Sequence, residues 1–326
     1  MTSGNLLVVK DLKKFFPLRK GLFTKPRVWA QAVAGVSFAI KKGESFGLVG
    51  ESGCGKTTLA RLIMRLLRPT AGQIVFDGTD ITAMNSKAMR PLRRRMQIIF
   101  QDPYASLNPR FRAASIVTEP LSARLRMTKA RRRQEAARLL IKVGLNAHDV
   151  LKYPHEFSGG QRQRLGIARA LSVQPDLIVA DEPVSALDVS VQAQIINLLL
   201  DLKENANLTY LFISHDLSVV EYLCDRIAVM YLGRIVELAP KNNFRNVPRH
   251  PYTKMLLHAA PQPDPLMPME IDVRDEEAPN PINPPSGCGF HPRCPYMRNR
   301  CRVNVPSLVK VDKSHYVACL NLNLKT

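Results

Sequence analysis

The sequence predicts an α/β fold built on a parallel sheet, and three observations support this prediction. Short apolar runs at 177–180, 210–213 and 227–230 have the length and composition of buried strands. Helical or loop segments separate these runs, which is the alternation expected of a parallel sheet. Another apolar run at 46–49 leads into a glycine-rich loop and a helix-like segment. We therefore expect a sheet with helices packed on its faces.

The elements around this sheet change from mainly strands to mainly helices along the chain. Strand-like runs at 7–9, 33–40 and 74–76 alternate with turns before residue 85. Residues 130–143 predict a helix, and another helix is expected with Ser190 as its N-cap. The apolar residues at helical spacing in this second helix are Val191, Ile195, Leu198, Leu199 and Leu202. We interpret this stripe as ordinary core.

A proline-rich stretch predicts a domain boundary. Eight prolines between residues 261 and 285 disfavour a regular helix or a central strand. We expect one large domain over residues 1–260, followed by a linker and a small C-terminal segment over residues 261–326. That segment holds four of the six cysteines.

Composition limits the class of protein. The 47 basic and 27 acidic residues give a net charge of +20, which attracts phosphates of nucleic acid or of anionic lipids without choosing between them. No run approaches the roughly 18 apolar residues of a membrane-spanning helix, and the N-terminal residues lack the pattern of a secretory signal. We expect a cytosolic location, where the cysteines are free, catalytic or metal-binding rather than paired in disulfides.

The glycine-rich loop after 46–49 fits the phosphate-binding pattern G-x-x-x-x-G-K-[ST]. Its residues are Gly50, Glu51, Ser52, Gly53, Cys54, Gly55, Lys56, Thr57 and Thr58. Glycines let backbone N–H groups and the following helix N-terminus face phosphates, while Lys56 supplies charge and Thr57 supplies a hydroxyl for Mg²⁺. The loop alone is compatible with a kinase, a GTPase, a helicase or a transporter ATPase.

Polar residues follow two of the apolar strands. Asp181 and Glu182 end the run at 177–180, and Ser214 and His215 end the run at 210–213. Because ligands of open α/β sheets bind at the carboxyl ends of the strands, we expect these side chains on one rim. Asp181 suits coordination of Mg²⁺, and Glu182 suits polarisation of the attacking water.

A second anion-binding element precedes the acidic strand. Ser158, Gly159, Gly160 and Gln161 begin a predicted helix, so that N–H donors and a hydroxyl are exposed to an anion. With the phosphate loop and the acidic strand, this motif makes residues 1 to about 260 resemble the nucleotide-binding subunit of an ATP-binding-cassette (ABC) transporter. Phe157 stands where leucine often begins this signature, an exchange that leaves the polar positions intact.

The resemblance implies a P-loop core of the ABC type, with an N-terminal antiparallel β subdomain and a helical subdomain that carries the signature. By the same resemblance, Gln101 senses Mg²⁺ and adjoins the membrane subunit, Asp188 lies in the loop that crosses to a second monomer, and His215 contacts the γ-phosphate. ATP is then held between the phosphate loop of one subunit and the signature of the other. Phe16 is the expected adenine-stacking aromatic, with Phe15 and Trp29 as alternatives.

Several stretches resemble the ATPase subunits of oligopeptide and dipeptide importers in particular. These stretches are residues 50–56, 100–109 and 250–253. The resemblance implies a peripheral protein on the cytoplasmic face of the inner membrane, bound to two permeases, to a related second ATPase and indirectly to a solute-binding protein. Importers of glutathione, nickel or antimicrobial peptides remain alternatives, because the cargo is chosen by the other subunits.

The C-terminal cysteines predict a metal site. Cys288, Cys294, Cys301 and Cys319 follow the spacing C-x5-C-x6-C-x17-C, in a segment too short to build its own core. A zinc-type C-x2-4-C pair is missing, and the peptide-importer resemblance implies a [4Fe–4S] cluster, which we favour over zinc or free thiols. Such an extension completes the expected fold as a small cysteine-rich addition.

Two other classes share parts of this pattern. The positive charge would suit a soluble ABC-type ATPase that acts on nucleic acid. Such proteins, however, carry coiled-coil or metal-binding insertions or a second cassette. Residues 50–161 carry neither heptads nor cysteine pairs. A small-molecule kinase would share the phosphate loop but would have no use for the signature. We therefore expect no nucleic acid partner.

Overall fold

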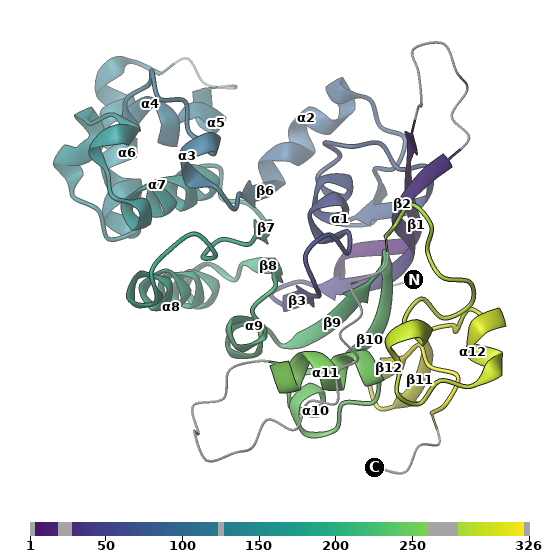
Figure 1. Cartoon of the computed structure of the whole chain (residues 1–326). Helices are drawn as coiled ribbons and strands as arrows, with labels where there is room; N and C mark the ends of the chain where they lie inside the picture. Colours follow the sequence, from purple (N-terminus) through teal and green to yellow (C-terminus); the bar gives the residue numbers. More distant parts are fainter. Residues whose placement is uncertain (1–3, 19–27, 123–126, 260–279, 323–326) are drawn as a thin grey trace. The chain divides into compact units, whose positions relative to one another are not determined.

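The computed structural model describes residues 4–18, 28–122, 127–259 and 280–322. The chain folds into two compact units. Figure 1 shows the whole chain in colours that follow the sequence. Unit 1 comprises Met1–Ile40, Ser45–Ala83 and Ile213–Thr326, and unit 2 comprises Lys41–Glu44 and Met84–Phe212.

The first sheet of unit 1 is the expected N-terminal β subdomain. Its strands lie in the order β2-β1-β4-β5, and β4 runs antiparallel to both β1 and β5. The bounds are β1 Asn5–Leu18, β2 Val28–Lys41, β4 Ala71–Phe76 and β5 Thr79–Asp80. Asp77 and Gly78, both at positive φ, form the turn between β4 and β5.

The second sheet is mixed rather than purely parallel. In unit 1 its strands follow the order β11-β12-β10-β9-β3, where β3 and β9 are parallel and the other pairs antiparallel. Leu232 and Gly233, both at positive φ, form the tight turn between β9 and β10, which forces antiparallel pairing there. The bounds are β3 Ser45–Val49, β9 Arg226–Tyr231, β10 Arg234–Pro240, β11 Val309–Asp312 and β12 His315–Val317.

Short helices accompany these strands in unit 1. They are α1 Lys56–Ile63, α9 Leu217–Leu223, α10 Lys241–Asn246, α11 Pro251–Ala259, the 3-10 turn η3 His291–Arg293, and α12 Asn299–Val303. Phe46 of β3 is fully buried and stacks on Phe38 of β2, with ring centroids 4.9 Å apart. The strand that leads into the phosphate loop therefore rests in the core of the unit.

Unit 2 contains the rest of the predicted parallel strands and most of the helices. β6 (Met96–Ile99) and β7 (Leu177–Asp181) pair in parallel, and β8 (Thr209–Ser214) follows β7 in the strand order. All residues of β7 and β8 are buried. The helices are α2 Ser86–Arg95, α3 Pro103–Ser106, α4 Ala113–Val117, α5 Glu119–Ser122, α6 Lys129–Lys142, η1 Ala147–Leu151, η2 Pro154–Glu156, α7 Gly159–Leu171 and α8 Val189–Ala206.

The predicted N-cap of α8 was wrong by two residues. Asp188 is the N-cap, and Ser190 lies inside the first turn. Both are cap-forming residue types, but Asp188 has the extended backbone that a cap requires, with φ −63° and ψ 150°. The interpretation of the apolar stripe as core is confirmed for Ile195, Leu199 and Leu202, which are buried, whereas Val191 and Leu198 are half-buried.

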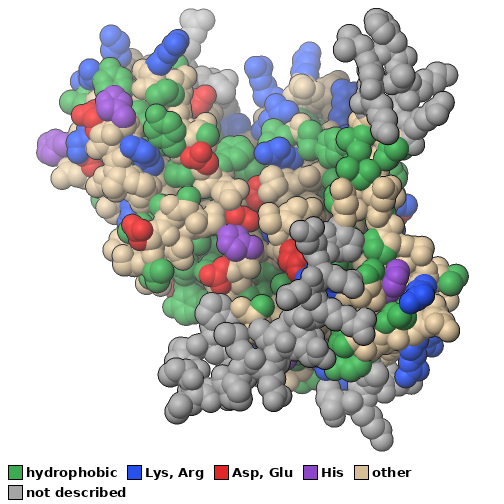
Figure 2. Space-filling model, viewed as in Figure 1, with side chains coloured by type: hydrophobic (Ala, Val, Ile, Leu, Met, Phe, Trp, Pro, Cys, Tyr) green, Lys and Arg blue, Asp and Glu red, His purple; other side chains and the backbone are tan. Residues whose placement is uncertain are grey.

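The linker up to residue 279 lies outside the described residues. Within the described part of the chain, no helix has both the length and the apolar character needed to cross a membrane. Basic side chains are visible over α2 and over α12 (Figure 2), and three arginines occupy the last turn of α2, where they complement the helix dipole.

Candidate functional site

The phosphate loop has the conformation that its glycines predict. Gly50, Gly53 and Gly55 have φ values of 155°, 79° and 108°. A Cβ atom at Gly50 would lie 2.2 Å from the carbonyl oxygen of Met230, and one at Gly55 would lie 2.0 Å from that of Ala32. Backbone packs against these two positions so closely that a side chain has no room.

Lys56 sits at the start of α1 and closes the loop. Its Nζ donates to the carbonyl oxygens of Gly50 at 2.6 Å and Glu51 at 2.9 Å, and the residue is buried. The Cys54 thiol is also buried, and burial raises its pKa, so it is a neutral side chain that fills space in the loop. The loop thus combines a fixed cation with the positive end of a helix, an arrangement suited to phosphates.

The signature motif forms a capped helix start in unit 2. Ser158 is the N-cap of α7: its Oγ accepts from the Gln161 N–H at 3.3 Å, and its own N–H donates to Gln161 Oε1 at 3.0 Å. Ser158 and Gly159 are exposed, whereas Phe157 is buried and anchors the motif. A Cβ atom at Gly160 would lie 2.4 Å from Cγ1 of Val191, so this glycine permits close packing of α7 on α8.

The acidic strand brings Glu182 and Gln101 together. Asp181 is buried at the end of β7, and the next residue, Glu182, has a φ of 49°. This left-handed conformation is uncommon for a residue with a side chain. Gln101 Nε2 donates to Glu182 Oε2 at 2.8 Å, which leaves the amide oxygen of Gln101 as an available acceptor.

The stretch after Gln101 is an exposed surface tied to the signature helix. Asp102 caps α3 by accepting from the N–H groups of Tyr104 and Ala105, and the side chain of Tyr104 is 58% exposed. The Arg162 guanidinium of α7 lies 5.2 Å from the Tyr104 ring centroid. Arg169, also on α7, donates to the carbonyl oxygen of Ser106 at 2.7 Å. One helix therefore connects this surface with Ser158.

The other predicted residues lie at loop positions. His215 is exposed directly after β8, and Asp216 fixes this turn by capping α9 and donating its N–H to Ser214 Oγ. Asp188 is exposed at the start of α8. Phe16 is half-buried in β1, with Lys14 Nζ 5.0 Å from its ring centroid, and Trp29 is 46% exposed in β2. The choice of adenine-stacking aromatic stays a prediction.

The predicted site residues divide between the two units. The phosphate loop and His215 belong to unit 1, and Gln101, the signature, Asp181, Glu182 and Asp188 belong to unit 2. Two residues of the site were missed from sequence: Tyr252 and Arg293 both contact Glu51, which lies 201 and 242 positions away. No local pattern signals such distant partners, although Tyr252 belongs to the 250–253 stretch noted above.

The four C-terminal cysteines line one small cavity of about 20 Å³. Burial raises the pKa of Cys294 to about 11 and also raises those of Cys288 and Cys319, and the mutual charges of the cysteines act in the same direction. Such thiols are protonated at neutral pH unless a cation holds them as thiolates. Among the residues that the structure describes, no three His, Cys, Asp or Glu side chains are arranged to hold a metal ion. The predicted iron–sulfur cluster is not confirmed by this geometry.

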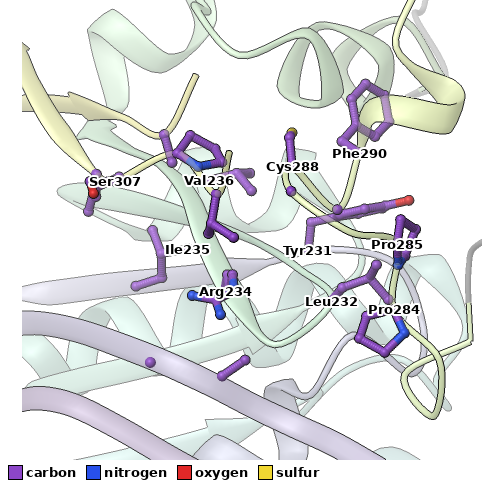
Figure 3. A pocket seen from close by; sticks show the side chains of 18 of the residues that line it. Tyr231, Leu232, Arg234, Ile235, Val236, Pro284, Pro285, Cys288, Phe290 and Ser307 are labelled. Atoms are coloured by element: carbon purple, nitrogen blue, oxygen red, sulfur yellow. The ribbon is translucent and has the colours of Figure 1, made fainter. Parts of the chain in front are cut away.

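A larger cavity of about 710 Å³ adjoins the cysteine cavity, since Cys288 and Phe290 line both; its lining also includes Arg234 (Figure 3). None of residues 50–58 lines it, so it is separate from the phosphate loop.

Comparisons with known proteins identify the family. The family model for ABC transporters matches residues 33–185, and the model for the oligopeptide/dipeptide transporter C-terminal region matches residues 236–301. A probable peptide ABC transporter ATP-binding protein, y4tS, of Sinorhizobium fredii is 52% identical over 97% of this chain and 90% of its own length. The chain belongs to the oligopeptide/dipeptide family of ABC transporter ATP-binding proteins.

Further members of this ABC family agree with the assignment. The oligopeptide transport ATP-binding protein AppF of Bacillus subtilis is 50% identical over 98% of this chain and 99% of its own length. The dipeptide transport ATP-binding protein DppF of Haemophilus influenzae is 46% identical over 98% of this chain and 97% of its own length.

Solved structures of ABC cassettes confirm the fold. The dimeric structure of MJ0796, a bacterial ABC transporter cassette, has a TM-score of 0.65 and 29% identity, with coverage of 72% of this chain and 98% of that one. A post-hydrolysis dimer of the same cassette, bound to ADP and Pi, gives a TM-score of 0.64. The predicted ABC-type P-loop core is thereby confirmed, and its sheets are mixed rather than purely parallel.

Proposed function

We propose that this ATPase subunit powers the import of peptides across the cytoplasmic membrane by closing and reopening a dimer on its permeases. The observation that carries the hydrolytic part is the Glu182 carboxylate, held beyond the end of a buried strand and hydrogen-bonded by Gln101 at 2.8 Å. The names of the three relatives given above, each of which refers to peptide, oligopeptide or dipeptide transport, support the cargo class.

Each site residue has a role that its chemistry supports. Lys56 and the N-terminus of α1 neutralise the phosphates of ATP, and Glu182 accepts a proton from the attacking water. Thr57, Gln101 and Asp181 supply oxygen donors, the type that Mg²⁺ prefers, and the ion when bound would neutralise charge on the β- and γ-phosphates. Phe16 stacks on adenine, and His215 contacts the γ-phosphate.

The dimer explains why one chain carries two anion-binding elements. ATP bound to the phosphate loop is covered by Ser158, Gly159, Gly160 and Gln161 of a second ATPase, and Asp188 lies in the loop that crosses to it. The γ-phosphate provides contacts that only the closed dimer makes, as a ligand-driven switch requires. The second ATPase is a related but different subunit.

Two permeases and a solute-binding protein complete the assembly. The exposed surface around Tyr104, tied to the signature helix by two arginines, is where a permease docks. The ATPase is peripheral, on the cytoplasmic face of the inner membrane, and its positive charge favours anionic headgroups. Residues 1–260 form the nucleotide-binding domain, and residues 261–326 form the linker and the C-terminal segment.

The C-terminal cysteines hold a structural [4Fe–4S] cluster in this proposal. Its support is that Cys288, Cys294, Cys301 and Cys319 line a single cavity, and that an all-sulfur donor set suits iron–sulfur chemistry. No step of ATP hydrolysis depends on this group.

Glu182→Gln tests the function directly. The variant keeps the hydrogen-bonding shape but cannot accept a proton, so we expect ATPase activity to fall about a hundredfold or more while ATP binding is retained. The full chain, reconstituted with its permeases, would be assayed with and without peptide-loaded binding protein. Unchanged turnover in the variant would remove Glu182 from its role, and stimulation by nucleic acid instead of peptide-loaded binding protein would favour the alternative class.

A further inference from the structure

Glu51, the second residue of the phosphate loop, is held from two sides. Its backbone N–H donates to Tyr252 Oη at 3.0 Å, and both of its carboxylate oxygens accept from Arg293 Nη1 at 3.0 Å. The Arg293 and Glu51 side chains are only 10% and 26% exposed, so solvent screens this pair far less than a surface ion pair.

Arg293 is itself anchored by Phe290 of the C-terminal segment and by Met255 of α11. Its guanidinium lies 6.0 Å from the ring centroid of Phe290, and Nη2 approaches the Met255 sulfur of α11 at 3.7 Å. Phe290 is 2% exposed and packs against Tyr252 and Tyr231, with centroids 5.4 Å away in both cases. Figure 3 shows Tyr231 and Phe290 on the same side of the 710 Å³ cavity, near Cys288.

Tyr252 is linked through His250 to a buried carboxylate of the sheet. Glu237 of β10 is 0% exposed and accepts from the N–H groups of Arg249 and His250 and from His315 Nε2 of β12, at 2.7–2.9 Å. The Tyr252 N–H in turn donates to His250 Nδ1 at 3.1 Å. Glu237 thus connects the stretch 250–253 with the C-terminal segment. Each of these two parts also contacts Glu51, the first through Tyr252 and the second through Arg293.

The negative charge of Glu51 lies in a loop that is expected to bind phosphates. A carboxylate in a phosphate loop repels phosphates, and Lys56 Nζ is occupied with the carbonyl oxygens of the same loop. Arg293 cancels the charge of Glu51 and holds its side chain in place.

We propose that Arg293 and Tyr252 are positioning residues through which the C-terminal segment sets the affinity of the phosphate loop for ATP. The inference rests on the proposed function, because it concerns the same nucleotide site. It does not depend on what the four cysteines bind.

The test compares Arg293→Gln with Arg298→Gln in the full-length chain. Arg298 is an exposed residue of the same segment, so it controls for the loss of one positive charge. Binding of AMP-PNP with Mg²⁺ is measured by calorimetry, and steady-state hydrolysis gives kcat and KM. We expect Arg293→Gln to raise Kd and KM about tenfold with kcat nearly unchanged, and Arg298→Gln to leave all three unchanged.

A charge-rescue variant separates positioning from general damage to the fold. In Arg293→Gln with Glu51→Gln the unpaired carboxylate is gone, so most of the lost affinity should return, whereas a merely structural defect would deepen. Tyr252→Phe removes only the hydroxyl acceptor, and we expect a Kd about threefold higher. Thermal unfolding confirms that each variant is folded.

The outcomes distinguish this inference from the proposed function. If wild-type chain binds AMP-PNP but Arg293→Gln binds it equally well, or if the double variant shows no recovery, the positioning role is refuted and the ATPase assignment stands. If wild-type chain fails to bind AMP-PNP, the proposed function itself fails.

Discussion

Gly160→Ala should destabilise unit 2 through a single steric contact. The added Cβ would lie 2.4 Å from Cγ1 of Val191, about 1 Å inside the normal separation of carbon atoms. Relief requires α7 and α8 to move apart or Val191 to leave its preferred rotamer, and overpacking of this kind costs about 1–3 kcal/mol. We therefore expect the free energy of unfolding to fall by that amount.

The matched control lies on the same helix. Gly166 is buried, but a Cβ atom there would meet nothing within 4 Å. Gly166→Ala should leave stability unchanged or raise it by about 0.5–1 kcal/mol, because alanine loses less backbone entropy in a helix than glycine. Both variants would be compared by urea unfolding followed by circular dichroism, with ATPase activity measured in parallel.

The double variant Gly160→Ala with Val191→Ala completes the experiment. Removing Cγ1 of Val191 opens the space, so stability should largely return. The reasoning is refuted if Gly160→Ala is as stable as wild type or if Val191→Ala restores nothing. ATPase activity that stays low in a stable double variant would show that Gly160 also serves the phosphate of a partner subunit.

Two further predictions concern unit 1. Glu237→Gln retains the size of the side chain but loses the negative charge that accepts hydrogen bonds from two N–H groups and from His315. We therefore expect the free energy of unfolding, measured by chemical unfolding, to fall by about 2–4 kcal/mol. A loss below about 0.5 kcal/mol would contradict the burial argument. Anaerobically purified protein should be brown and contain iron if the cysteine cavity holds the proposed cluster, and Cys294→Ser should lose both colour and iron; colourless protein with one zinc per chain would overturn that proposal.

Local chemistry explains what could be predicted from sequence. The phosphate loop follows from Gly50, Gly53 and Gly55, because positive φ is a property of single residues, and the helix at 130–143 follows from local composition. The signature start could also be predicted, because Ser158 and Gln161 interact within one turn.

Pairings over long separations could not be predicted in this way. The contact of Arg293 with Glu51 depends on how β9, β10 and the C-terminal segment pack, and nothing in either local sequence requires it. The antiparallel edge of the second sheet has a similar cause, since one tight turn at Leu232-Gly233 reverses the chain where alternation alone predicts parallel strands. The N-cap of α8 was misplaced because Asp188 and Ser190 are equally good cap formers by residue type.

The link between α3 and α7 has a mechanical consequence. The helix α7 has 13 residues and is therefore about 20 Å long. Two of its side chains, Arg162 and Arg169, contact α3 from different points along α7. A load on the exposed Tyr104 ring would therefore reach α7 at two points along its length, and we expect α7 and its N-cap Ser158 to respond as one rigid body. The position of the Ser158 hydroxyl is therefore coupled to that of the exposed surface around Tyr104.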